Sequence, residues 1–273
     1  MYESHWRLTA RPFDHSVDAR FYYPSEAQQG ALLKLRYVLE NRRAAALLAG
    51  ATGLGKTLLA QTLLRQLPEV FTPQVHLVFP QMPAESLLAY LAGELTEGSG
   101  KGNVPSIDQS LRLVERRLRE NHQAGRHAVI VLDEAQLLAD AGTLQTIRLL
   151  LNLEHQGQPL ASFLLTGQTA LLVAIERIPE LEERMAVKCL LRRFSLEETM
   201  GYIQHRLSAA GAVQPIFTPA AVEAIHQETL GIPRRINRLC DLALLVGFAE
   251  ELTSLGPEQI EAVSQELVTA TAE

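Results

Sequence analysis

The sequence predicts an α/β domain with a five-stranded parallel sheet, followed by a small domain made of helices alone. Up to about residue 194, short apolar runs alternate with helix-period patterns, as in a parallel sheet that is covered by helices on both faces. From Ser195 onward every pattern has the period of a helix. A glycine-rich loop also joins the first apolar run directly to the helical pattern that follows it.

Five apolar runs are predicted to form the strands. The run at 127–132 is the clearest, because an uninterrupted apolar segment is typical of a strand buried on both faces of a parallel sheet. The expected strands are residues 44–48, 75–79, 127–132, 160–166 and 187–191.

Amphipathic patterns and capping residues predict the helices. Ser195 and Glu198 form a capping box, and Pro219 and Pro233 suit the first position of two later helices. A glycine-rich stretch at 97–103 is expected to be a flexible linker. The expected helices are residues 31–43, 58–67, 86–95, 106–123, 143–155, 170–177, 195–210, 218–229 and 232–249, and one that begins at 257.

Composition describes an ordinary soluble globular protein. The chain has 273 residues, of which 47% are hydrophobic and 21% charged, and no apolar run approaches the roughly 18 residues of a membrane span. The first ten residues carry charges and lack the apolar core of a secretory signal. Cys189 and Cys240 lie in separate apolar segments, which predicts reduced core residues and a cytoplasmic protein. The net charge of −6 argues against indiscriminate nucleic-acid binding.

Residues 50–57 predict a phosphate-binding loop. They match the pattern G-x-x-x-x-G-K-[ST] between a strand and a helix, the context that this pattern requires; a plain glycine turn is the alternative. Backbone amides of the loop would surround a polyphosphate at the positive end of the helix. Lys56 would reach the β- and γ-phosphates, and the Thr57 hydroxyl would hold Mg²⁺. The candidate nucleotide-binding residues are Gly50, Ala51, Thr52, Gly53, Leu54, Gly55, Lys56, Thr57 and Leu58.

Asp133 and Glu134 follow the apolar strand at 127–132 and predict the second half of the site. The aspartate would reach Mg²⁺ through its water shell, and the glutamate would act as general base toward the attacking water. An acidic strand-end turn without function has the same appearance.

Three further places offer groups for the γ-phosphate in the transition state. Thr166 and Gln168, at the end of the fourth expected strand, are both candidates, as is a plain turn. Arg184 precedes the last strand; the alternative for it is an exposed arginine paired with neighbouring glutamates. Arg234 lies in the first turn of a helix, where a cation opposes the helix dipole and therefore suggests an anionic partner.

These features resemble the AAA+ ATPases, and among them the ExeA/GspA-type general-secretion ATPases. The resemblance covers nearly the whole chain. It rests on the phosphate loop, on the Asp133–Glu134 pair and on the segments 1–3, 11–13, 18–21, 131–136, 148–154, 165–168 and 231–237.

The resemblance implies a P-loop NTPase (AAA+) αβα domain at 31–194, a helical lid at 195–273, and ATP with Mg²⁺ between them. It implies a ring or filament in which Arg184 is an arginine finger for the neighbouring subunit and Arg234 a second sensor in the lid. Residues 1–30 are expected to be a strap packed on the core, which also contributes to the pocket for the base. The expected activity is ATP hydrolysis at subunit interfaces, coupled to assembly of an envelope or secretion apparatus with a protein partner.

Two departures from the family pattern concern the loop and the length. Ala51 and Leu54 replace the Glu and Thr that the group often carries, and phosphate binding does not need those side chains. Longer secretion members continue into a membrane span and a peptidoglycan-binding domain. This sequence contains neither, so a direct role at the cell wall is not expected.

A DNA-associated regulator is the alternative function. The same AAA+ branch resembles the MuB/TnsC-type transposition proteins, which form ATP-dependent filaments on DNA. A basic group would be the candidate DNA contact, with a solvated helix face as its structural alternative; it comprises Arg112, Arg116, Arg117 and Arg119. A scaffold that is switched by nucleotide and hydrolyses it slowly is a third possibility.

Overall fold

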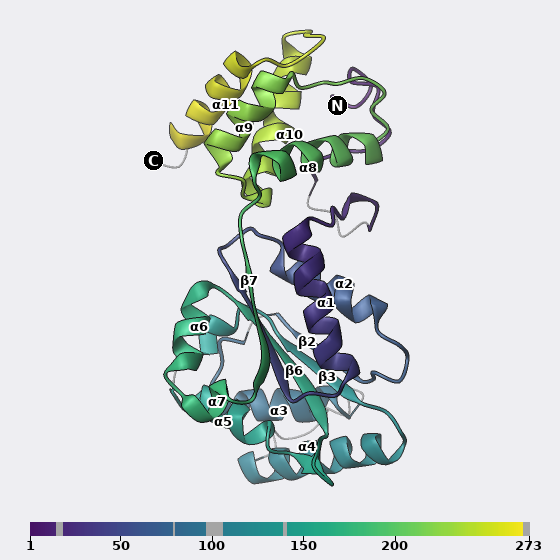
Figure 1. The fold of residues 1–273 in the computed structure, drawn as a ribbon, viewed down its shortest axis with the longest axis vertical. Helices are drawn as coiled ribbons and strands as arrows, with labels where there is room; N and C mark the ends of the chain where they lie inside the picture. Colours follow the sequence, from purple (N-terminus) through teal and green to yellow (C-terminus); the bar gives the residue numbers. More distant parts are fainter. Residues whose placement is uncertain (15–18, 79, 97–105, 139–140, 270–273) are drawn as a thin grey trace. The chain divides into compact units, whose positions relative to one another are not determined.

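The computed structural model describes residues 1–14, 19–78, 80–96, 106–138 and 141–269. The chain divides into two compact units. The sheet unit comprises residues 28–52 and 56–191, and the helical unit comprises residues 1–27, 53–55 and 192–273. Figure 1 shows both units and labels the helices α1 to α11 and the strands β2, β3, β6 and β7.

The sheet unit contains a five-stranded parallel sheet, as predicted. The strand order is β2-β3-β6-β1-β7, and every neighbouring pair is parallel. The central strands are buried at every position because helices cover both of their faces. The strands are β1 (Ala45–Gly50), β2 (Gln74–Leu77), β3 (Ala128–Leu132), β6 (Ala161–Gly167) and β7 (Met185–Leu191).

The register brings the carboxyl ends of three strands to one edge of the sheet. Leu132 of β3 pairs with Leu165 of β6, and Leu48 of β1 pairs with Thr166. The residues that follow these strands therefore meet at the same edge. This edge is where parallel α/β sheets bind their ligands.

Helices connect the strands of the sheet unit, with the short helix η2 (Ala135–Leu138) directly after β3. α2 packs on β1 and β6. The helices are α1 (Glu26–Glu40), α2 (Lys56–Gln66), α3 (Ala84–Glu94), α4 (Ile107–Gln123), α5 (Ala141–Leu150), α6 (Thr169–Glu176) and α7 (Pro179–Glu182).

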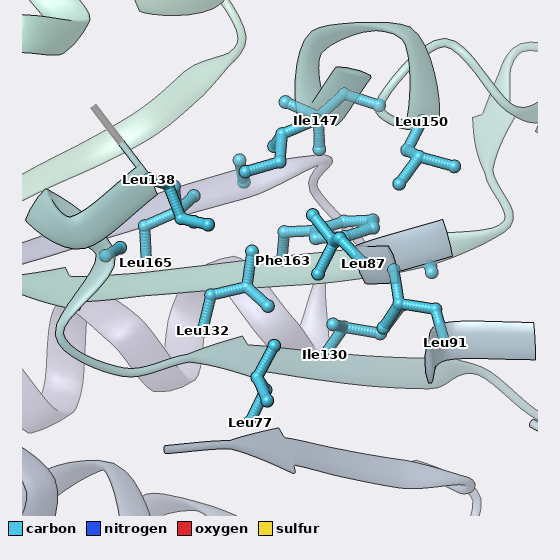
Figure 2. Close-up of a cluster of buried hydrophobic side chains, with 14 of the residues drawn as sticks. Leu77, Leu87, Leu91, Ile130, Leu132, Leu138, Ile147, Leu150, Phe163 and Leu165 are labelled. Atoms are coloured by element: carbon cyan, nitrogen blue, oxygen red, sulfur yellow. The ribbon is translucent and has the colours of Figure 1, made fainter. Parts of the chain in front are cut away.

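One face of the sheet packs on α3 to α6 through a continuous apolar core. Figure 2 shows Ile130 and Leu132 of β3 beside Phe163 of β6, with Leu87 and Leu91 of α3 facing them. Each of these side chains is at most 2% exposed. Full burial of one such side chain contributes about 1.5–3 kcal/mol, so this core fixes the strands that carry the site residues.

The predicted helix at 143–155 is wrong at its carboxyl end. α5 ends at Leu150, and Glu154–His155 (β4) pairs antiparallel with Gln158–Pro159 (β5). Gln156 and Gly157 between them have φ of 51° and 76°, the left-handed conformation of a tight hairpin turn. The turn therefore overrides the helix-period pattern of the leucines that precede it.

Smaller differences concern element ends. β2 ends at Leu77, two residues before the predicted end, and the predicted position Phe79 lies outside the described residues. β7 begins at Met185 instead of residue 187, and α7 was not predicted. The predicted linker at 97–103 also lies outside the described residues.

The helical unit contains the all-α region that the sequence predicts after residue 194. Ser195 caps α8 through a capping box with Glu198, and Thr218 caps α9. Proline at the first position of the other helices suits their starts, because its missing N–H would have no partner there. The helices are α8 (Leu196–Ala209), α9 (Pro219–Thr229), α10 (Pro233–Ala249) and α11 (Pro257–Thr269).

The N-terminal residues pack within the helical unit. Tyr2, Trp6 and Phe13 belong to the same apolar cluster as the buried faces of α8 to α11. The indole N–H of Trp6 donates to the Leu244 carbonyl at 2.9 Å, and Arg206 donates to the Asp14 carbonyl at 2.7 Å. These contacts make the segment part of the helical core. Its predicted role at a base pocket stays a prediction.

Candidate nucleotide-binding site

The glycine loop joins β1, which ends at Gly50, to α2, which begins at Lys56. Gly53 and Gly55 have φ of 86° and 88°, a left-handed conformation that glycine adopts without strain. The backbone amides in the first turn of a helix have no partner within the helix, and the positive end of the helix dipole lies there. A loop of this kind followed by a helix is suited to bind phosphate groups.

Lys56 lies against the loop from which it projects. Its Nζ donates to the carbonyls of Gly50 at 3.0 Å and Ala51 at 3.1 Å, and the residue is 5% exposed. A buried ammonium group needs such partners because its desolvation is costly. The loop thus holds a cation beside the amides that would surround a polyphosphate.

Asp133 is the centre of the site in the sheet unit. It is 1% exposed and follows β3. The Thr57 hydroxyl donates to its Oδ2 at 2.5 Å, the Thr166 hydroxyl donates to its Oδ1, and the Glu134 amide donates to the same Oδ1 at 2.9 Å. The structure therefore brings together Thr57, which follows β1, Asp133, which follows β3, and Thr166 near the end of β6. Hydroxyl and carboxylate oxygens are the hard ligands that Mg²⁺ prefers, so Thr57 and Asp133 fit this ion.

Thr166 and Gln168, the two alternatives at the end of β6, have different surroundings. Thr166 is fully buried against Asp133. Gln168 is the exposed N-cap residue of α6, and its side chain makes no capping hydrogen bond. Its backbone amide donates to Oε1 of Gln136 at 2.9 Å.

Glu134 has a left-handed backbone with φ of 51°, which is uncommon for a residue other than glycine. Its Oε2 accepts a hydrogen bond from Nε2 of Gln136 at 2.5 Å. Sequence reasoning gave Gln136 no role of its own, since a polar residue in a turn carries no spacing signal.

His76 of β2 is a second residue that the sequence did not single out. Its Nε2 lies 3.9 Å from Oδ2 of Asp133. This buried nitrogen has no hydrogen-bond partner within the described ranges. The pairing of β2 with β3, which places His76 opposite Val131, brings the ring to this edge of the sheet. An isolated histidine in a strand gives no sequence signal for that position.

Arg184 lies between α7 and β7, and its side chain is exposed. The predicted alternative was a pair with neighbouring glutamates. Among the described residues, no carboxylate forms an ion pair with Arg184, and the neighbouring Glu182 pairs with Lys188 instead. The structure thus leaves the guanidinium of Arg184 open to solvent.

Arg234 belongs to the helical unit, in the first turn of α10. Its side chain is exposed, and that turn contains no acidic residue. In the part of the chain that the structure describes, no ion pair involves Arg234. Among the described residues of this unit, no carboxylate therefore compensates the cation that opposes the helix dipole.

Residues 39–174 match the family model of the AAA domain. The chain is also 35% identical over 251 residues to general secretion pathway protein A of Aeromonas hydrophila. This chain is an AAA+ protein related to general secretion pathway protein A. The match covers 91% of this chain and 45% of the relative, so the chain spans less than half of that protein's length.

Solved AAA+ structures share the predicted fold. The Aeropyrum pernix ORC2 protein matches with a TM-score of 0.71 at 18% identity, over 94% of this chain and 71% of that chain. Cdc6p from Pyrobaculum aerophilum has a TM-score of 0.72 at 17% identity, over 93% and 70%. The Thermotoga maritima RuvB motor has a TM-score of 0.60 at 19% identity, over 89% and 69%. These similarities confirm the predicted αβα P-loop fold of the AAA+ class.

Among the residues that the structure describes, no helix combines the length and the apolar character that a membrane crossing needs.

Proposed function

We propose that this AAA+ protein binds ATP with Mg²⁺ and hydrolyses it to ADP and phosphate. The observation that carries the proposal is the hydrogen bond of 2.5 Å between the Thr57 hydroxyl and Asp133, because it joins the loop to the acidic strand end. Lys56 and the loop amides bind the phosphates, and Thr57 and Asp133 hold the ion. Magnesium, when bound, neutralises charge on the β- and γ-phosphate oxygens.

Glu134 is the proposed general base. It accepts a proton from a water molecule while the water oxygen bonds to the γ-phosphorus. The bond between this phosphorus and the bridging oxygen of the β-phosphate breaks, which releases phosphate and ADP. Thr166 is the proposed first sensor in preference to Gln168, because its hydroxyl is buried on Asp133 whereas the Gln168 side chain is exposed.

Hydrolysis takes place at subunit interfaces of an oligomer in this proposal. Arg184 supplies positive charge to the site of a neighbouring subunit, and its exposure without an ion pair in the described part of the chain supports that role. Arg234 is the proposed second sensor of the lid. A cation supplied by a neighbour makes turnover dependent on assembly.

The cellular role that we infer is assembly of a secretion or envelope apparatus, and the protein is cytoplasmic in this picture. This inference rests on the relative, general secretion pathway protein A, of which the chain covers 45%. A protein of that apparatus is the corresponding partner.

The structure gives the DNA-associated alternative less support than its basic cluster suggested. The arginines of α4 face acidic partners on the same helix: Arg112 with Asp108, Arg116 and Arg117 with Glu120, and Arg119 with Glu115. This pairing describes a solvated helix face of mixed charge. Two structural neighbours are origin-recognition proteins described with DNA, but at 15–16% identity they share the fold alone.

One experiment tests both functions. ATP turnover and particle size are measured with ATP and Mg²⁺, with and without duplex DNA, at low and at physiological salt. Turnover in an assembled form without DNA supports the first proposal. Stimulation by DNA that fades with salt supports the alternative, because phosphate contacts release counterions. A monomer that turns over ATP at full rate contradicts the shared site.

A further inference from the structure

The carboxylate of Glu134 is connected to the end of β6 by a single side chain. Nε2 of Gln136 donates to Oε2 of Glu134 at 2.5 Å, and Oε1 of Gln136 accepts from the Gln168 amide at 2.9 Å. Gln168 is the N-cap residue of α6 and directly follows β6. One amide group therefore spans two strand ends, that of β3 and that of β6.

Gly167 provides the space for this amide. A Cβ atom at position 167 would lie 2.6 Å from Oε1 of Gln136 and 2.8 Å from Cδ2 of Leu171. Real side chains do not approach so closely, so a residue larger than glycine would displace the amide of Gln136. The close approach therefore requires glycine at this position.

Glutamine suits this position because its amide has both a donor and an acceptor at the same end. A glutamate would keep the acceptor for the Gln168 amide, but it would place a second carboxylate against Glu134. A leucine of similar size would provide neither hydrogen bond.

We propose that Gln136 is a positioning residue that holds the carboxylate of Glu134 in the orientation needed for hydrolysis and couples it to the end of β6. This inference rests on the proposed function, in which Glu134 is the general base. Gln136 acts through Glu134, and among the described residues its side-chain hydrogen bonds go to Glu134 and to the Gln168 amide, not to the glycine loop or to Asp133. Its loss should therefore lower turnover while ATP affinity is retained.

The test compares turnover with affinity in the full chain. Gln136→Leu removes both hydrogen bonds, and Gln136→Glu removes the donor in a side chain of the same shape. We expect kcat to fall by about 10- to 100-fold in each, since a misplacement of about 1 Å costs up to about 100-fold. The Kd for a fluorescent ATP analogue with Mg²⁺ should stay within twofold. Gln123→Leu, on the exposed surface of α4, is the matched control.

A double-mutant cycle supplies a readout that a general packing role would not give. Gly167→Ala should lower kcat by about tenfold in the parent, because its methyl group displaces the Gln136 amide. In a Gln136→Ala background the clash with Oε1 is removed and the contacts with Leu171 and the backbone remain, so the same substitution should cost clearly less than in the parent. Additive losses would show that Gly167 and Gln136 act separately and would contradict the proposal.

The outcomes separate this inference from the proposed function. If Glu134→Gln loses turnover but Gln136→Leu and Gln136→Glu stay within threefold of the parent, the positioning role is wrong and the general base stands. A loss of ATP affinity equal to the loss of kcat would also overturn the positioning role. If Glu134→Gln itself keeps its turnover, the proposed general base fails first, and the role of Gln136 fails with it.

Discussion

The hydroxyl of Thr57, in the first turn of α2, donates to the carboxylate of Asp133 at the end of β3, although 76 positions separate them in the sequence. Each is weak evidence for a site when taken alone, because threonines after glycine turns and acidic residues after strands are common. Their direct contact at the carboxyl edge of a parallel sheet is the structural argument for the proposed magnesium site.

Lys56→Ala should strongly weaken ATP binding. The ammonium lies at the loop, and hydrogen bonds from a charged group contribute about 1.5–3 kcal/mol, so Kd should rise by at least about tenfold. Titration calorimetry with ATP and Mg²⁺ measures the change. Lys34→Ala, on the exposed side of α1, is the matched control and should bind like the parent. Unchanged affinity in Lys56→Ala would refute the loop assignment.

Glu134→Gln should bind ATP and fail to turn it over. The substitution keeps the size of the side chain and removes its ability to accept a proton, so kcat should fall by about 10²- to 10⁴-fold. Phosphate release at saturating ATP measures kcat, and nucleotide recovered from the protein shows whether ATP stays bound. Glu180→Gln on α7 is the control, because it is exposed. Turnover within threefold of the parent would remove Glu134 from the role of base.

Arg184→Ala should lose activity that a second subunit can restore. A finger supplied by a neighbour contributes about 10³–10⁵ in rate in related phosphoryl-transfer enzymes. In mixtures with Glu134→Gln subunits, some interfaces combine an intact Glu134 with an intact Arg184, so part of the activity should return. Arg177→Ala, also exposed, should behave like the parent. Mixtures as inactive as their components would show that Arg184 does not act between subunits.

The fold could be predicted in most of its parts because its signals are local. Uninterrupted apolar runs such as 127–132 indicate strands buried on both faces, and Ser195 with Glu198 indicates the start of α8. The prediction was wrong where two local signals competed. Leucines up to Leu153 continue the helical pattern, but Gln156 and Gly157 form a turn and pair two short strands.

The candidate site residues that belong to a sequence motif could be predicted, and the others could not. The loop, Asp133 and Glu134 directly follow expected strands, so their position in the sequence predicts them as site residues. The contacts of Gln136 with Glu134 and of His76 with Asp133 depend on strand register and side-chain direction, and neither residue has a spacing rule. The N-terminal aromatic residues indicated packing, but their partners in α10 and α8 depend on the tertiary fold.

His127 should make the stability of the protein fall in mild acid. Its ring is fully buried, and its Nε2 lies 2.9 Å from Oγ of Ser162. Because the Ser162 hydroxyl donates to the Arg43 carbonyl at 2.6 Å, Nε2 carries the proton and donates to Ser162. Nδ1 has no partner among the described residues. Burial, followed by the charges of Arg42 and His122, lowers the pKa of His127 to about 4.

The direction of the pH effect follows from this lowered pKa. An unfolded histidine has a pKa of about 6.5, so below that pH the unfolded chain binds a proton that the folded chain refuses until about pH 4. The free energy of unfolding should therefore be highest above pH 6.5 and fall as pH drops toward 4. Between pH 7.5 and 5 the titration of His127 should lower the free energy of unfolding by about 2 kcal/mol.

Urea unfolding followed by circular dichroism, at pH 7.5 and at pH 5, measures this change. His127→Gln keeps a donor for Ser162 and does not titrate, so its free energy of unfolding should fall by about 2 kcal/mol less than that of the parent. His155→Gln, in the hairpin, should keep the parent's dependence, and an equal slope in His127→Gln would show that His127 is not the group responsible.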